Sequence, residues 1–370
     1  MTILFLCGSL APGHDGVGDY TRRLAGELMR QGHIAAIVAL NDKKIDVLEN
    51  TTQVTDGIEV PVLRLPSVLA NKERYAEAKL YIDEFNPEWL SLQYVPFSFQ
   101  DKGLPWGLGR QLAKFGKGRK WHVMFHELWV GMNVEASVKL KLWGEIQRLI
   151  LRKTLWQLKP IAVHTQTKVY QYQLSKLGCK ANYLPLFGNI PFVQGTVCVK
   201  SATDKISFVI FGSIHEGAPV EDFAKQVKAY SIANKIQVEL TFVGRCGAEQ
   251  ANWIRAWSEQ SLPYKVMGEQ TPEKISEVLS ASNWGITTTP LLLAEKSGTV
   301  AAMLEHGMTV ICVARKWTIK NYNLSKDMRV VDYVNNLAPV LFINKNNDKN
   351  INTKINLSQI TDTFVKQTQA

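Results

Sequence analysis

The sequence lacks the features that mark several classes of protein. None of its apolar runs reaches the roughly 20 residues that a membrane-spanning helix needs, and no basic segment precedes the apolar start at 2–7 to make a signal peptide. Its five cysteines are scattered and form no CxxC pair, which argues against a zinc site and against a disulfide framework. We therefore expect a protein of the reducing cytoplasm.

Acidic residues are outnumbered by basic ones. The net charge is +10, with 46% hydrophobic and 21% charged residues, as in an ordinary globular protein. A basic surface attracts nucleic acid, anionic lipid or a phosphorylated substrate, and the charge alone does not select among them. Because Lys and Arg are spread thinly and no nucleic-acid-binding motif gathers them, we do not expect a nucleic-acid partner.

Short β-rich segments alternate with longer amphipathic ones, which predicts mostly parallel sheets covered by helices. Turn-forming residues interrupt the alternation at 183–203. The pattern predicts strands at 2–7, 34–40, 60–65, 88–93, 121–125 and 160–164, then at 206–211, 236–243, 264–267, 284–288 and 308–313. We therefore expect an α/β chain with Rossmann-like domains at 1–190 and 191–345. A tail at 346–370 follows, in which 345–354 suggests a mobile loop and 357–367 a helix.

A glycine-rich segment at 9–20 joins the first strand to the first helix. Gly16 and Gly18, with Val17 between them, would let backbone amides approach an anionic ligand at the start of a helix. Ligands of open α/β sheets bind at the carboxyl ends of the strands, where this segment falls. The spacing is not GxGxxG, so a dinucleotide fingerprint is absent. The alternative is an ordinary turn with Asp19 as the helix cap.

A second polar segment, at 287–299, joins a strand to a helix in the second half. Glu295 could accept hydrogen bonds from sugar hydroxyls, and Ser297, Gly298 and Thr299 could present amides to a diphosphate. The alternative is that Ser297 or Thr299 only caps the helix.

Three further polar residues follow strands of the first half. His126 and Glu127 fall at a strand end, where the residues of a site are expected, and capping of the strand is the alternative. His164 also follows a strand, and a packed residue explains it as well as a functional one.

Five segments share their order and spacing with a known family. They are 16–33, 88–94, 125–127, 267–284 and 302–311. Together they resemble the family 4 retaining glycosyltransferases of the GT-B fold, over residues 2–315. The resemblance implies a GT-B architecture, in which two Rossmann-like parallel-sheet domains face an interdomain cleft.

The resemblance also implies an activity, which is transfer of a sugar from a nucleotide-sugar donor to an acceptor glycan, lipid-linked saccharide or small molecule. The donor would lie mainly on the second domain and the acceptor on the first. The family uses no cofactor and no metal, since helix dipoles and basic residues stabilise the leaving diphosphate. This chain likewise has no DxD motif. Transfer would retain the anomeric configuration.

The resemblance assigns roles by position. His126 would contact the transferred sugar, and Glu295 would accept from its hydroxyls. The donor side would comprise Gly16, Val17, Gly18, Gly212, Ser213, Arg245, Gly268, Glu269, Lys296, Ser297, Gly298 and Thr299. The acceptor side would comprise Gln93, Tyr94 and Glu127.

The chain departs from the family at the donor. The family holds the diphosphate with an Arg and a Lys in the first loop of its second domain, but here the Arg position reads Ser213 and no Lys follows in the loop. Each lost charge-assisted contact costs about 1.5–3 kcal/mol. Arg245 or Lys296 could compensate. The alternative is a non-catalytic GT-B-like protein that binds a sugar or a partner chain.

A basic amphipathic segment runs from Val134 to Lys159. Its apolar residues include Trp143 and Trp156, and Lys and Arg are interspersed among them. A helix of this kind can lie on an anionic membrane, which would place the protein at the inner face of the membrane. The alternative is a core-facing helix with a solvated basic face.

Overall fold

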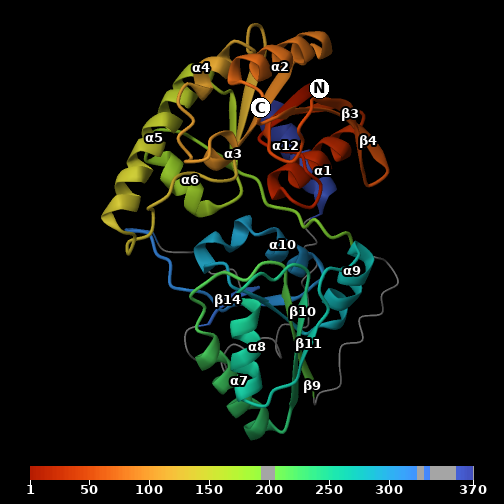
Figure 1. Ribbon diagram of the computed structural model, residues 1–370, viewed down its shortest axis with the longest axis vertical. Coiled ribbons are helices and arrows are strands. Elements are labelled where there is room, and N and C mark those ends of the chain that lie inside the picture. Colours follow the sequence, from red (N-terminus) through yellow and green to blue (C-terminus); the bar gives the residue numbers. More distant parts are fainter. Residues whose placement is uncertain (193–204, 323–328, 334–355, 370) are drawn as a thin grey trace. The chain divides into compact units, whose positions relative to one another are not determined.

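The computed structural model describes residues 1–192, 205–322, 329–333 and 356–369 (Figure 1). The chain divides into two compact units, Met1–Pro185 with Leu357–Ala370 and Leu186–Asn356. The sequence placed the division at 190 and treated 346–370 as a separate tail. The structure instead gives the last helix to the first unit, because that helix packs on unit 1. The predicted mobile loop at 345–354 lies outside the described residues.

Unit 1 is built on a sheet whose strand order is β3-β4-β2-β1-β5-β6-β7-β8. All pairings are parallel except the antiparallel pair β3 and β4. The strands are β1 (Thr2–Cys7), β2 (Ile34–Asp42), β3 (Glu49–Thr55), β4 (Ile58–Pro66), β5 (Trp89–Tyr94), β6 (Lys120–Phe125), β7 (Ala162–Thr165) and β8 (Asn182–Tyr183). β1 is almost completely buried, as its apolar sequence requires in a sheet covered on both faces. β5 is buried throughout as well, although Ser91 and Gln93 interrupt its apolar sequence.

Helices cover this sheet. They are α1 (Gly16–Arg30), α2 (Asn71–Phe85), α3 (Pro96–Phe99), α4 (Leu108–Ala113), α5 (Val138–Leu158), α6 (Lys168–Ser175) and α12 (Leu357–Gln369). α12 is the C-terminal helix drawn in blue and lies beside α1 (Figure 1). Phe364 of α12 is fully buried, with its ring 6.3 Å from that of Phe5 in β1. The last helix therefore belongs to the core of unit 1.

Unit 2 has a parallel sheet in the order β11-β10-β9-β12-β13-β14. Its strands are β9 (Lys205–Phe211), β10 (Gln237–Val243), β11 (Tyr264–Val266), β12 (Trp284–Thr287), β13 (Thr309–Cys312) and β14 (Val330–Asp332). Its helices are α7 (Val220–Asn234), α8 (Gln250–Glu259), α9 (Pro272–Ala281), the 3-10 helix η1 (Leu291–Lys296) and α10 (Gly298–Glu305). On one face of the sheet, Phe208, Phe223, Trp253 and Trp257 form the aromatic centre of the core.

The hairpin of β3 and β4 was absent from the sequence prediction. Asp56 and Gly57 form its two-residue turn, and both have positive φ angles, 47° and 80°. An Asp-Gly pair between two segments is a strong hairpin signal. β3 has the sequence ENTTQVT, is largely exposed and carries no apolar alternation, so the strand itself gave no sign.

Both sheets have the doubly wound order, in which the chain runs outward from the first strand and then returns to its other side. In unit 1 the reversal lies between β1 and β5, and in unit 2 between β9 and β12. The loops at the carboxyl ends of adjacent strands diverge there, which is where such sheets bind ligands. The segments 9–20 and 287–299 both follow strands at these reversals. The fold thus supports the positions of both predicted loops.

Candidate active site

The glycines of the first loop belong to the first turn of α1. The helix begins at Gly16, and its cap is Asp15, whose carboxylate accepts a hydrogen bond from Gly18 N at 2.7 Å. Asp19, the cap considered from sequence, instead accepts from Gly13 N and pairs with Arg22. Burial raises the pKa of Asp15, although its hydrogen bonds to the amides of Gly18 and Val17 oppose the shift. An acidic side chain therefore occupies the helix end that the sequence assigned to donor phosphates.

Gly18 has a packing role. A Cβ placed there would lie 2.6 Å from the carbonyl oxygen of Ser9, much closer than any side chain allows. The absence of a side chain lets α1 rest on the segment that leaves β1.

A small pocket of about 190 Å³ opens beside this loop. It lies at the carboxyl ends of β1 and β2, and its polar lining includes His14, Asp15, Asn41, Lys43 and Lys44. The residues at 41–44 were not singled out from sequence. Their position directly after the second predicted strand could have marked them as residues of a site.

Asp42 holds the walls of this pocket together. It is fully buried and accepts from Ser9 Oγ, Leu10 N and Lys44 N, each at 3.0 Å, and from Arg64 Nε at 2.9 Å. Burial alone would raise its pKa, but the hydrogen bonds from Arg64 and from the two backbone amides outweigh that effect and lower it. Asp42 is therefore ionised and fixes the loop after β1.

His126 follows β6 and is buried among polar and aromatic side chains. Its Nε2 lies 2.8 Å from Gln93 Oε1, and its Nδ1 lies 3.3 Å from Gln166 Oε1. The Tyr20 ring meets its imidazole edge to face at 4.9 Å between centroids. The structure thus brings together residues that follow or end three strands, and Gln166 joins them without having been predicted.

The other predicted residues of this group have different environments. Tyr94 is buried, with its ring against Phe125 at 5.3 Å, and burial raises its pKa. The Gln93 side chain is buried as well. Glu127 is half-buried, and its backbone nitrogen lies 3.4 Å from the Tyr94 carbonyl. In unit 1, therefore, Gln93 and Tyr94 pack and support His126 rather than form an open surface.

In unit 2, several predicted donor residues lie on loops at the carboxyl ends of β9, β10 and β11. Gly212 has a φ of 76°, and a Cβ there would lie 2.9 Å from Thr299 Cγ2, so the first loop passes directly over the start of α10. Gly212 N donates to the Val243 carbonyl at 3.0 Å, and Gly244 N donates to the Gly268 carbonyl at 2.7 Å. Ser213 is exposed.

The start of α10 is capped and leaves amides available. Ser297 Oγ accepts from Val300 N at 3.4 Å and lies 3.0 Å from Thr299 Oγ1. The Gly298 and Thr299 amides precede the first intrahelical hydrogen bond, which runs from Ala301 N to the Ser297 carbonyl. The cap that the sequence offered as an alternative is real, and it coexists with an anion-attracting helix end.

Two of the predicted cationic and acidic residues form an exposed pair. Arg245 Nε lies 3.4 Å from Glu269 Oε2, and the Arg245 side chain is 53% exposed. A pair of this kind contributes little energy.

Lys296 lies close enough to the β9 loop for its charge to act on His215, and so does Arg315, which the sequence prediction did not name. Partial burial lowers the pKa of His215, and the charges of Arg315 and Lys296 lower it further. A Cβ at Gly217 would lie 3.4 Å from Arg315 Cβ, so Arg315 stands beside the same loop. Arg315 is exposed and follows the end of β13, a position that could have drawn attention to it. The structure gathers Lys296, Arg315 and His215 around the loop that lacks the expected Arg and Lys.

Glu295 lies at the end of η1. The pKa of Tyr322 is raised by burial and by the nearby negative charge of Glu295. Within the described ranges, no group of three or more His, Cys, Asp or Glu side chains is arranged to hold a metal ion. No helix in that same part of the chain is long and apolar enough to cross a membrane.

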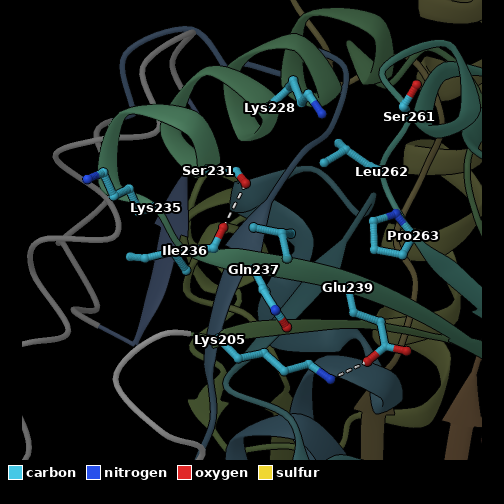
Figure 2. Close-up of a pocket in the computed structure, with 11 residues that line it drawn as sticks. Lys205, Lys228, Ser231, Lys235, Ile236, Gln237, Glu239, Ser261, Leu262 and Pro263 are labelled. Carbon is cyan, nitrogen blue, oxygen red and sulfur yellow. Dashed lines mark hydrogen bonds and ion pairs between the residues drawn. The ribbon is translucent and has the colours of Figure 1, made fainter.

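A larger pocket of about 530 Å³ lies elsewhere in unit 2, between the end of α7 and the starts of β9 and β10 (Figure 2). It includes Lys205, Lys228, Lys235 and Glu239, and Glu239 pairs with Lys205 at 2.7 Å. Ser231 Oγ donates to the Ile236 carbonyl at 2.7 Å. This pocket is at the amino ends of the strands, and it contains none of the predicted site residues.

The strand order of both units is that of a known fold. The two doubly wound parallel-sheet units have the fold of GT-B glycosyltransferases. No protein-family model matches the sequence, and no curated protein sequence matches it.

Solved structures share the fold over nearly the whole chain. Anabaena HepE in complex with UDP and glucose is 13% identical, with a TM-score of 0.57 over 100% of this chain and 97% of that one. The catalytic domain of starch synthase IV from Arabidopsis thaliana, bound to ADP and acarbose, is 10% identical, with a TM-score of 0.53 over 100% and 99%. The lipopolysaccharide outer core galactosyltransferase WaaB is 13% identical, with a TM-score of 0.53 over 99% and 91%.

Proposed function

We propose that this chain is a metal-independent glycosyltransferase that moves a sugar from a nucleotide-sugar donor to an acceptor. The observation that carries the proposal is the start of α10, where the Thr299 side chain lies against Gly212 of the loop after β9, at the carboxyl end of the sheet. A helix start of this kind attracts an anion such as a diphosphate. The similar fold of HepE, solved with UDP and glucose, supports a nucleotide-sugar as the ligand.

Lys296 and Arg315 supply the positive charge that the first loop lacks. Both residues come after this loop in the sequence, Lys296 in η1 and Arg315 after β13, and both positive charges lower the pKa of His215 within the loop. Arg245 is the weaker candidate because Glu269 neutralises it in an exposed pair. In this proposal the family's cations have been replaced by residues from the turn before α10 and from the segment after β13.

Transfer breaks the bond between the anomeric carbon and the diphosphate oxygen, and it forms a bond from that carbon to an acceptor hydroxyl. In a single-step transfer that retains configuration, the acceptor hydroxyl attacks from the face that the diphosphate leaves. The departing diphosphate oxygen then takes the hydroxyl proton. Cations and helix amides stabilise the charge that develops on the diphosphate. Glu295 accepts from sugar hydroxyls, and His126 contacts the transferred sugar.

The acceptor belongs to unit 1. The pocket beside Asp15 and Asn41 carries hydrogen-bonding groups and the Lys43 and Lys44 cations. Its polarity suits a glycan, or a lipid-linked saccharide that carries phosphate.

The test of the proposed function is donor consumption by the purified full chain. UDP-, GDP- and ADP-sugars are incubated with EDTA present, with and without candidate acceptors, and the released nucleoside diphosphate is measured. Release that persists in EDTA supports the proposal. A chain that binds a sugar or a partner protein but releases no diphosphate from any donor would be the non-catalytic alternative.

A second function, attachment to an anionic membrane, is favoured by the exposed face of α5. The buried face of this helix contains Gly144, Gln147, Ile150, Leu151, Thr154 and Leu158. On the opposite face, Val138, Leu142, Ile146, Leu149 and Trp156 are exposed. At 100° per residue these apolar side chains fall within an arc of roughly 80°. Leu142 is 63% exposed and Trp156 72%.

Basic residues flank this apolar stripe. Lys141, Arg148, Arg152 and Lys159 fall on one side of it at helical spacing, and Lys153 lies within it. One face of α5 packs on the core, as one of the two sequence interpretations expected, and the opposite face is left apolar and basic. We propose that the stripe inserts at the level of the lipid headgroups while the flanking cations meet anionic lipids.

A further inference from the structure

Buried polar side chains form a continuous chain across unit 1, from His126 to the C-terminal helix. Gln93 links His126 to Ser91, since its Oε1 lies 2.8 Å from His126 Nε2 and its Nε2 donates to Ser91 Oγ at 2.8 Å. Ser91 Oγ lies 2.7 Å from His122 Nδ1.

The chain continues through a second histidine. His122 Nε2 lies 2.9 Å from His164 Nδ1, and His164 Nε2 lies 2.8 Å from Gln367 Oε1 in α12. One hydrogen-bonded row thus crosses β5, β6 and β7 and ends on a helix that lies far away in the sequence.

Water has little access to the interior of this row. Ser91, Gln93, His122 and His164 are each at most 1% exposed. Burial lowers the pKa of His122 well below its usual value and that of His164 to about 4. Both rings are therefore neutral near pH 7, and a neutral imidazole has one N–H and one acceptor nitrogen.

The hydrogen bonds in such a row all point the same way, because each ring and hydroxyl donates once along it. The Gln367 oxygen at the end of the row accepts and so sets the direction, which the Gln93 amide continues with its oxygen toward His126 and its nitrogen toward Ser91. His126 then donates from Nε2, and the row ends with His164 donating to the Gln367 oxygen. The His126 Nδ1 is left as an acceptor that faces Gln166, whose amide supplies a donor after a half-turn.

We propose that Gln367 is a positioning residue that, through His164, His122, Ser91 and Gln93, holds His126 as the tautomer with its proton on Nε2. Where it concerns catalysis, this inference rests on the proposed function. An imidazole held in this form brings no positive charge near the sugar carbon, which becomes electron-poor as the diphosphate leaves. The C-terminal helix thereby positions a residue of the site from two strands away.

The chain offers a clean test because α12 is anchored independently of Gln367. Phe364 packs its ring 5.1 Å from His122 and 5.9 Å from His164 and is fully buried. Gln367→Ala removes the terminal acceptor and keeps this anchor. Gln367→Glu keeps an acceptor at the same place. Gln369→Ala, at an exposed position of the same helix, is the matched control.

The readout is the tautomer of His126 in the full chain labelled with ¹⁵N in the histidine rings. Long-range ¹H–¹⁵N correlation spectra distinguish a proton on Nε2 from one on Nδ1, and His126→Asn identifies the signal. We expect the Nε2–H form in the unmodified protein, in Gln367→Glu and in Gln369→Ala. Gln367→Ala should show a mixture or the Nδ1–H form. The same single tautomer in Gln367→Ala as in the unmodified protein would overturn the proposal, as would an Nδ1–H form in the unmodified protein.

Kinetics test the catalytic part separately. Gln367→Ala should lower kcat by about tenfold or more, since loss of tautomer control is costly, with little change in KM for the donor. Gln367→Glu should keep most of the kcat of the unmodified protein. A shifted tautomer with unchanged kcat would overturn the positioning role. If the unmodified chain consumes no donor, the proposed function fails while the spectra still decide the tautomer.

Discussion

Asp42 shows how much one buried residue does for the first-unit loop. It neutralises Arg64, orients Ser9 and Leu10, and so shapes the pocket beside α1. The sequence marked its place after a predicted strand but gave no reason to single it out. Its partner Arg64 lies on β4, which is beside β2 in the sheet. The sequence pattern predicts strands but not which strands are neighbours, so it could not predict this ion pair.

Asp42→Asn should lower the free energy of unfolding by about 2 kcal/mol, because it removes the buried carboxylate that accepts from Arg64 Nε and leaves Arg64 paired with the partly exposed Glu49 alone. Urea unfolding followed by circular dichroism measures the loss. Asp101→Asn is the control, since Asp101 pairs with Lys43 at the exposed surface and its loss should leave the midpoint unchanged. Equal midpoints for Asp42→Asn and the unmodified chain would show that the cluster does not stabilise the fold.

The residues of the candidate site were foreseen unevenly. His126, Ser297 and Thr299 could be located because strand ends and helix starts are visible in the sequence. Arg315 and Gln166 were missed because each follows a strand and lies beside residues that are distant in the sequence. Only the folded structure shows these neighbours. Asp15 was missed as the cap because α1 begins three residues earlier than the apolar pattern indicated.

At the scale of elements, β6, β7 and α12 share a buried pair of histidines. His164 has an ordinary pKa of 6.5, which burial lowers to about 4, and burial also lowers the pKa of His122 well below its usual value. The unfolded chain thus binds more protons than the folded chain between these values. The contribution that the neutral, buried His164 makes to the free energy of unfolding is fully present above pH 6.5. It is lost as the pH falls toward 4.

We expect His164 alone to reduce the free energy of unfolding by about 3 kcal/mol over this interval. Urea midpoints measured from pH 7.5 to pH 4.5 test this expectation. His164→Gln should flatten the dependence, and His14→Gln, at an exposed position, should leave it as it was. A His164→Gln profile parallel to that of the unmodified chain would contradict the burial of a neutral His164.

The exposed stripe of α5 is the element on which membrane attachment depends. The full chain should float with vesicles that contain anionic lipid at low salt and less so at high salt, since the flanking cations are screened. Leu142→Asp combined with Trp156→Asp should abolish flotation. Leu80→Asp, on exposed α2, is the matched control and should float normally. Flotation that survives the double substitution would exclude α5 as the contact.

Most elements could be predicted because βα alternation is a local property of the sequence. β3 could not, because a strand of exposed polar residues has no apolar period to detect. Its Asp56-Gly57 turn was the available signal. The helix at 357–369 was predicted by its pattern, but its place in unit 1 was not, because Phe364 and Gln367 find their partners more than a hundred residues away.

At the scale of the whole molecule, both sheets are doubly wound, and the segments 9–20 and 287–299 follow strands at the point where the strand order reverses. Unit 1 contains His126 and a polar pocket, and unit 2 contains a helix start with nearby cations. The departure in sequence from the family's Arg and Lys therefore does not leave the β9 loop without positive charge.

Nucleoside diphosphate binding tests the central claim most directly. Calorimetric titration of the full chain with UDP, GDP and ADP in EDTA should show binding of at least one of them. Lys296→Ala and Arg315→Ala should each weaken that binding about tenfold or more, because each removes a charge-assisted contact. Arg245→Ala, which removes a cation already paired with Glu269, should change it by less than about threefold. Absence of binding by all three diphosphates, or a loss confined to Arg245→Ala, would contradict the proposed donor site.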